Sequence, residues 1–245
     1  MNTLKIKYFV LGGQSSNGGV DKKLFSQVLE LRRLGLDIKL ILINVGDACY
    51  PPYDFLTIYK IDNVPTENLL GRIKRARKIS KIFSETIDSL DSGDVLYYRY
   101  SVPFPLYFPK KYLRPFRTCN IVTEHQTKEL SEFKLYDDAL SYWSEYFFGK
   151  LLKKQSDAII GVTNEITQHE IFCAEDPKKP HLTIGNGFTV QSVSVRRAPY
   201  HTDGALHLLC VANINRWHGL DRLLQGLVTY NGMPKVILHI AGDGA

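Results

Sequence analysis

The chain has 245 residues, of which 44% are hydrophobic, so it can bury the core of one large domain or two modest ones. The apolar run Tyr8–Leu11 near the amino terminus is too short for a signal-peptide core or a membrane span, and we expect a globular, cytoplasmic protein. The formal net charge of +6 favours an anionic partner, and nucleoside diphosphates, anionic lipids and nucleic acids all qualify.

The cysteines give no sign of a disulfide framework or a metal site. Cys49, Cys119, Cys173 and Cys210 lie far apart and lack paired metal-ligand spacing. Cys119 and Cys210 fall in strands that we expect to be buried. The sequence therefore predicts reduced cytoplasmic thiols.

Apolar runs and helical patterns alternate over residues 1–190, which predicts an α/β fold with a parallel sheet. The first strand leads through the loop Gly12–Gly19 into a helix. This loop lacks the G-x-G-x-x-G fingerprint, which disfavours an NAD enzyme, and an ordinary turn without a ligand is the alternative. The predicted inward face of that helix is Val20, Leu24, Val28, Leu31 and Leu34. The predicted strands are Leu4–Leu11, Asp37–Asn44, Leu56–Ile61, Asp94–Tyr100, Thr118–Thr123, Asp157–Val162 and His181–Ile184.

Two later helices are predicted from spacing. Apolar residues of Glu67–Leu90 recur every three or four positions, while basic residues cluster on the other side. Such a helix can lie on an anionic membrane surface, and a solvated face is the alternative. These basic residues are Arg72, Lys74, Arg75, Arg77, Lys78 and Lys81. In the second helix we expect a buried stripe of Leu140, Trp143, Phe147 and Leu151.

The segment Ala205–Gly244 predicts a strand, helix, strand unit. The apolar run Ala205–Ala212 precedes the turn Asn213–Gly219, a helical pattern follows, and a second apolar run ends at Gly242. Runs without polar alternation suit parallel strands covered on both faces, whose ligands gather at the carboxyl ends. Glycines there let a phosphate or sugar approach the backbone, and a helix beginning near Gly219 directs free amides at an anion.

Several of these segments together resemble retaining, nucleotide-sugar-dependent glycosyltransferases of family four, with the GT-B architecture. Trp217–Leu224 and Gly242–Gly244 resemble the start of the donor-binding domain. Asn17–Val20 resembles the first glycine-rich loop, Glu124-His125 lies where the family keeps a functional histidine, and Ile184–Phe188 resembles the segment before the domain linker. The resemblance spans nearly the whole chain.

The resemblance implies a domain organisation and an activity. Residues 1–190 would form a Rossmann-like acceptor domain, 191–204 a linker, and 205–245 the beginning of a Rossmann-like donor domain. The activity implied is retaining transfer of a sugar from a nucleoside-diphosphate sugar to a glycan or lipid-linked acceptor, in polysaccharide or cell-envelope synthesis. Since such donor domains usually run to about 100–150 residues, we expect a truncated donor domain, little or no turnover, and self-association through that domain.

The resemblance also assigns residues to sites. His125 would serve the reaction centre, where it can hydrogen-bond a sugar hydroxyl, although a structural histidine is the alternative. Arg99, Glu124 and Asn164 would contact the acceptor, and Asn164 is otherwise part of a helix cap. The donor would be bordered by Gly18, Gly19, Asn213, Arg216, His218, Gly219, Gly242 and Gly244.

The chain departs from the family at the donor diphosphate. Asn213 and His218 stand where the family has an arginine and a lysine, and Arg216 or protonated His218 would have to supply the cation. No Asp-x-Asp motif occurs, so we expect neither a metal nor another cofactor.

The rival hypothesis is a non-catalytic subunit that uses a Rossmann-like domain to hold an acceptor or a membrane. An NAD-dependent oxidoreductase has only fold analogy in its favour, and we expect no nucleic-acid binding because a recognition motif is lacking.

Overall fold

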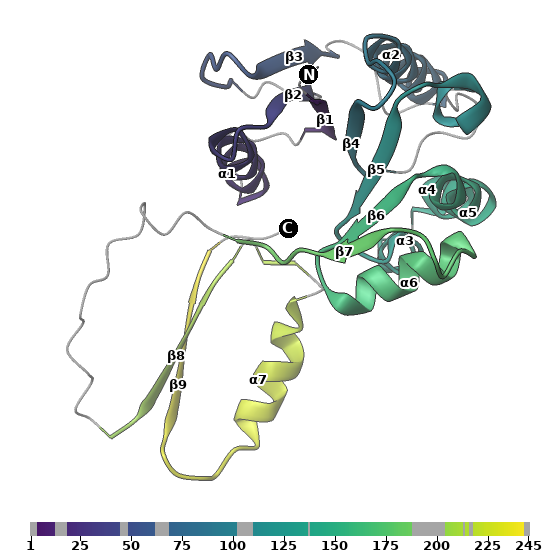
Figure 1. Ribbon diagram of the computed structural model, residues 1–245. Coiled ribbons are helices and arrows are strands. Elements are labelled where there is room, and N and C mark those ends of the chain that lie inside the picture. Colours follow the sequence, from purple (N-terminus) through teal and green to yellow (C-terminus); the bar gives the residue numbers. More distant parts are fainter. Residues whose placement is uncertain are drawn as a thin grey trace. The chain divides into compact units, whose positions relative to one another are not determined.

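The computed structural model describes residues 4–12, 19–44, 49–61, 69–101, 110–136, 138–187, 204–212, 214–215 and 218–242. The chain divides into two compact units, Met1–Val190 and Gln191–Ala245 (Figure 1). Of the predicted linker 191–204, only Gly204 lies within the described residues.

The first unit contains a seven-stranded parallel sheet in the order β3-β2-β1-β4-β5-β6-β7. The predicted α/β fold with a parallel, Rossmann-like sheet is therefore confirmed. The strand order reverses between β1 and β4, and ligands of such sheets bind outside the carboxyl ends of the strands at this point. The strands are β1 Lys5–Leu11, β2 Asp37–Asn44, β3 Leu56–Lys60, β4 Val95–Arg99, β5 Asn120–His125, β6 Ala158–Gly161 and β7 His181–Thr183.

Helices cover both faces of this sheet, as Figure 1 shows. The cover includes α1 on one face and α2 on the other. Successive side chains of a strand point to opposite faces, so Tyr8 joins the core cluster that contains Leu24 of α1, while Phe9 joins the cluster that contains Phe83 of α2. The helices are α1 Gly19–Arg33, α2 Leu69–Asp88, α3 Glu129–Leu135, α4 Ala139–Ser144, α5 Lys150–Gln155 and α6 Asn164–Ala174, with 3-10 turns η2 Lys110–Tyr112 and η3 Arg114–Phe116.

The predicted inward face of α1 is correct only in its centre. Leu24 and Val28 are buried and Leu31 packs against the same cluster, but Val20 and Leu34 are exposed. Val20 belongs to the first turn of α1, and Leu34 follows its last residue. The sheet therefore covers only the middle turns of this helix.

The prediction of a buried stripe containing Trp143, Phe147 and Leu151 is wrong. Trp143 is 53% exposed and Phe147 is 65% exposed. A π-helical turn, η4 Glu145–Gly149, lies between α4 and α5 and adds a residue to the turn, which breaks the 3.6-residue period on which the prediction depended. The buried side of this segment is instead Ser144, Glu145, Gly149, Leu152 and Lys153.

The second unit contains the predicted strand, helix, strand arrangement. β8 Leu206–Val211 and β9 Val236–Ala241 pair in parallel, and α7 Leu220–Val228 connects them. Within this unit Leu209 and Val211 are largely exposed, and Cys210, which was expected to be buried, is only partly buried. One helix covers only one face of a sheet. Self-association through this unit stays a prediction.

Among the described residues, no helix is both long enough and apolar enough to cross a lipid bilayer. The twenty-residue helix α2, for example, carries six lysines and arginines.

We expect Gly161→Ala to destabilise the first unit. A Cβ atom at this last residue of β6 would lie 2.4 Å from Thr167 Oγ1 and 2.6 Å from Thr167 N, so α6 would have to move away from the sheet. Such overpacking costs about 1–3 kcal/mol in urea unfolding. The matched control is Gly185→Ala, where the added Cβ would be 3.9 Å from the Val162 carbonyl oxygen. Equal stabilities of the two variants would contradict the close packing of β6 against α6.

Candidate functional site

Polar side chains meet at the carboxyl edge of the sheet, beside the point where the strand order reverses. Arg99 is the last residue of β4, and its neighbour in the parallel ladder is Glu124 of β5. Lys23 reaches the same place from the first turns of α1. We call Lys23, Arg99 and Glu124 the edge cluster.

The edge cluster has an ionised carboxylate at its centre. Lys23 Nζ lies 2.9 Å from Glu124 Oε1, and the Tyr8 hydroxyl donates a hydrogen bond to Glu124 Oε2. Burial by itself raises the pKa of Glu124, but the bond from Tyr8 and the charges of Lys23 and Arg99 outweigh it, so the pKa lies below its usual value. Glu124 is therefore a hydrogen-bond acceptor at neutral pH.

Arg99 keeps a donor group without a partner. Its Nη1 atom is buried and makes no hydrogen bond to any described residue. The charge of the guanidinium helps to lower the pKa of Glu124, whereas burial raises the pKa of Asp21 in spite of Arg99. A buried N–H group without an acceptor is costly, and an oxygen-rich ligand at this edge would satisfy it.

His125 follows Glu124 in β5 but faces the opposite side of the sheet. Its ring is fully buried and stacks on Tyr100, with 4.5 Å between the ring centroids. Nδ1 lies 3.1 Å from Glu129 Oε1, and Nε2 lies 3.1 Å from Thr123 Oγ1. Both ring nitrogens are therefore engaged within the protein, and the predicted role of His125 at a reaction centre stays a prediction.

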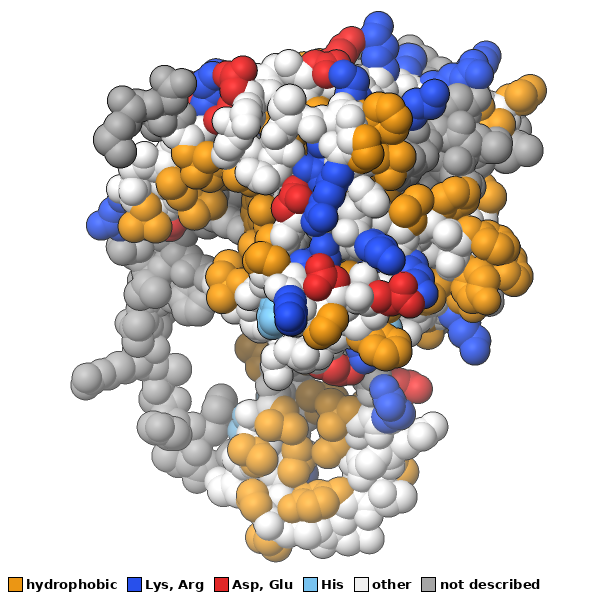
Figure 2. Space-filling model, turned by 45° about the vertical axis from the view of Figure 1, so that its right-hand side comes forward, with side chains coloured by type: hydrophobic (Ala, Val, Ile, Leu, Met, Phe, Trp, Pro, Cys, Tyr) orange, Lys and Arg blue, Asp and Glu red, His pale blue; other side chains and the backbone are white. Residues whose placement is uncertain are grey.

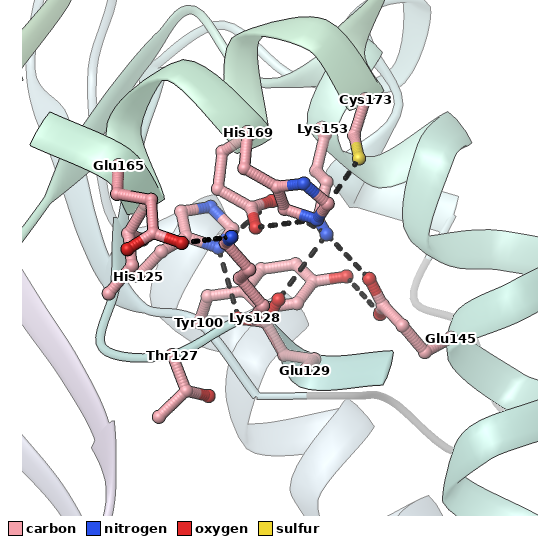
Figure 3. A network of polar contacts seen from close by, with 12 residues as sticks. Tyr100, His125, Thr127, Lys128, Glu129, Glu145, Lys153, Glu165, His169 and Cys173 are labelled. Atoms are coloured by element: carbon pink, nitrogen blue, oxygen red, sulfur yellow. Dashed lines mark hydrogen bonds and ion pairs between the residues drawn. The ribbon is translucent and has the colours of Figure 1, made fainter. Parts of the chain in front are cut away.

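A buried lysine near this histidine pairs with three carboxylates, and Figure 3 gives a close view of this group of contacts. Lys153 Nζ lies 2.6 Å from Glu145 Oε1, 2.6 Å from Glu170 Oε2 and 3.3 Å from Glu129 Oε2. The Tyr100 hydroxyl donates to Glu145 Oε2 at 2.8 Å. We call His125, Glu129, Glu145, Lys153 and Glu170 the buried network.

The charges of the buried network shift one another's ionisation. Desolvation opposes the charged form of Glu129, but His125 and Lys153 outweigh it and lower the pKa of this carboxyl to about 2. Burial raises the pKa of Glu145 and of Glu170. Burial would also lower the pKa of Lys153, yet the three carboxylates raise it above its ordinary value, so the ammonium is charged.

A pocket of about 280 Å³ adjoins the buried network. Glu129, Glu145 and Lys153 line one part of it, and His169 and Cys173 of α6 line another. Small ions and molecules therefore have a route towards the network.

The other site residues predicted for the first unit either take no part in the edge cluster or the buried network, or lie outside the described residues. Asn164 is the exposed first residue of α6, and the cap itself is Thr163, whose Oγ1 accepts a hydrogen bond from Ile166 N at 3.2 Å. Gly19 begins α1, and an added Cβ there would meet nothing within 4 Å. Gly18 lies outside the described residues.

Two glycines predicted for the donor are required by the backbone of the second unit. Gly219 has φ 63° immediately before α7, and Gly242 has φ 141°, with the Ala212 carbonyl oxygen only 1.8 Å from where a Cβ would lie. His218 Nδ1 accepts a hydrogen bond from Asn215 N at 3.0 Å and thereby closes the turn before the helix. Asn213, Arg216 and Gly244 lie outside the described residues. Donor binding by this unit stays a prediction.

Sequence reasoning missed Lys23, Glu145, Lys153 and Glu170. Lys23 could have been found, because it follows the glycine-rich loop by one helical turn. The sequence did not indicate that Glu145 and Lys153 are buried, since their burial depends on the π-helical turn. Glu170 lies on α6, and because glutamate is a common helix-forming residue, the sequence did not indicate that this side chain is buried.

No protein-family model matches the chain, and a search of curated proteins also gave no match. Membership of the glycosyltransferase family therefore stays a prediction from the sequence motifs.

We expect Lys153→Met to be strongly destabilising. The substitution leaves three carboxylates buried without their shared cation, and removing one partner of a buried ion pair costs about 3–5 kcal/mol. Lys154→Met is the matched control, since that side chain is 59% exposed and its loss changes stability by less than about 1 kcal/mol. Urea unfolding of both variants measures the difference, and similar stabilities would show that the network is dispensable.

Proposed function

We propose that the protein takes part in glycosyl transfer and that the edge cluster holds the sugar acceptor. The observation that carries this proposal is the buried, unpartnered Nη1 of Arg99 at the carboxyl end of β4. Its position beside the reversal of strand order is where open parallel sheets bind their ligands. The sequence motifs support the choice of an activated sugar as the co-substrate.

The edge cluster has the donors and acceptors that a carbohydrate needs. Arg99 and Lys23 donate to sugar hydroxyls or to an anionic group on the acceptor, while ionised Glu124 accepts from a hydroxyl. Because Lys23 also lies 3.1 Å from Gln126 Oε1, its ammonium is held in place before the ligand binds. In this proposal Glu124 orients the acceptor.

Substitution of Arg99 tests this proposal. We expect Arg99→Ala to weaken binding of simple saccharides, taken from a panel and followed by saturation-transfer NMR, by about tenfold or more, because a charge-assisted hydrogen bond is lost. Arg32→Ala is the control, since Arg32 lies in the last turn of α1 and pairs with Asp54. Unchanged saccharide binding in Arg99→Ala, or no binding by the unsubstituted chain, would refute the proposal for this edge.

A second candidate function is attachment to an anionic surface through α2. Lys74, Arg77, Lys78 and Lys81 are exposed on this helix, whereas its apolar side, including Phe83 and Ile87, is buried in the first unit. Lysine and arginine side chains gather at the top of Figure 2, at the height of α2 in Figure 1. The buried apolar side leaves charge as the means of attachment.

Charge reversal tests this second candidate. Replacing Lys74, Arg77 and Lys78 with glutamate is expected to abolish co-sedimentation with vesicles that contain phosphatidylglycerol. Uncharged phosphatidylcholine vesicles serve as the control for both proteins. Equal binding of the two proteins to the anionic vesicles would exclude α2 as the attachment site.

A further inference from the structure

We propose that His125, Glu129 and Glu170 bind a divalent transition-metal ion, beside the ion pair of Lys153 and Glu145. This site lies on the other side of β5 from the edge cluster, so the proposal does not depend on glycosyl transfer.

The donor atoms already have the spacing of a coordination sphere. One atom from each of the three side chains lies within 4.8 Å of the others. His125 Nδ1 is 3.1 Å from Glu129 Oε1 and 3.5 Å from Glu170 Oε2. Metal bonds of about 2.0–2.2 Å place neighbouring ligand atoms about 3–3.5 Å apart, so a bound ion requires only small side-chain adjustments.

The second ring nitrogen of His125 has a partner of its own in Thr123, which bears on how the ring is oriented. The hydroxyl of Thr123 donates to the Ala158 carbonyl oxygen, at 3.5 Å, and its oxygen can then accept from Nε2–H of His125. In that tautomer the Nδ1 lone pair faces Glu129 and Glu170. A metal ion binds at such a lone pair, and metal-bound histidines are oriented by this kind of second hydrogen bond.

Glu170 has one carboxylate oxygen that its neighbours leave unsatisfied. Its side chain is fully buried, and Lys153 Nζ lies 2.6 Å from Oε2. The other carboxylate oxygen, Oε1, has no hydrogen bond to any described residue. A metal ion would give this oxygen a partner, while Lys153 remains paired with Glu145 at 2.6 Å.

The ligand set indicates which ion is bound. One imidazole nitrogen with two carboxylates suits Zn²⁺, Mn²⁺ or Fe²⁺ better than Mg²⁺ or Ca²⁺, which prefer oxygen ligands alone. The adjoining pocket, which Glu129 also lines, gives the ion a route to the site.

The experiment is a titration of the full chain with Zn²⁺ by calorimetry, after treatment with a chelator and dialysis. We expect one equivalent to bind, and Glu170→Gln to weaken binding by more than about 100-fold, beyond the effect of a residue that only supports a ligand. Glu165→Gln, an exposed change on the same helix, should leave binding unaltered. Glu129→Gln provides a second test at a residue with the same proposed role.

Other groups able to bind zinc are tested separately. The rings of His207 and His239 lie side by side in the second unit, with 2.9 Å between their nitrogens, and Cys173 adjoins the pocket. His207→Asn and Cys173→Ser should leave binding intact. Loss of binding in either variant, unchanged binding in Glu170→Gln, or no binding by the unsubstituted chain would overturn the proposal.

Cobalt substitution provides a readout in the unsubstituted chain that does not depend on the folding of any variant. Visible bands of nitrogen and oxygen coordination are expected for bound Co²⁺. A thiolate charge-transfer band would instead show binding at a cysteine and would overturn the proposal.

Discussion

The helical layer beside β5 depends on one buried ammonium group. Lys153 Nζ lies within ion-pair distance of carboxylates from α3, the π-helical turn and α6. Buried charges are costly unless they are paired, so these segments are held in one arrangement in which the lysine serves all three. Through Glu129, the same network reaches His125 at the end of β5.

The π-helical turn follows from this requirement. Glu145 and Lys153 are eight residues apart, which in an uninterrupted α-helix would leave their side chains about 80° out of register. The extra residue in the turn brings both onto the buried side, where the lysine bonds to the carboxylate at 2.6 Å. The turn also moves Trp143 and Phe147 to the surface. Gly149 allows the close approach, since a Cβ there would lie 2.2 Å from Glu145 Oε1.

The alternation of side chains in β5 separates two polar centres that adjoin in sequence. Glu124 points to the side of α1, where Lys23 and Tyr8 hold it as an ionised acceptor, and His125 points to the side of α6. One centre lies at the sheet edge, where ligands bind, and the other is fully buried. The proposed acceptor site and the proposed metal site are therefore chemically independent, even though their key residues are neighbours in the chain.

The sequence by itself determined the parallel α/β fold, the strands, and the placement of Arg99 and Glu124 at a carboxyl edge. These features depend on local periodicity and on the rule that parallel strands end at one edge, both of which can be read from residue order. Only the tertiary structure decided that His125 is enclosed, that Glu145, Lys153 and Glu170 meet, and that Trp143 is exposed. Pairing of buried charges joins residues from separate helices and overrides helical periodicity, so no local pattern could reveal it.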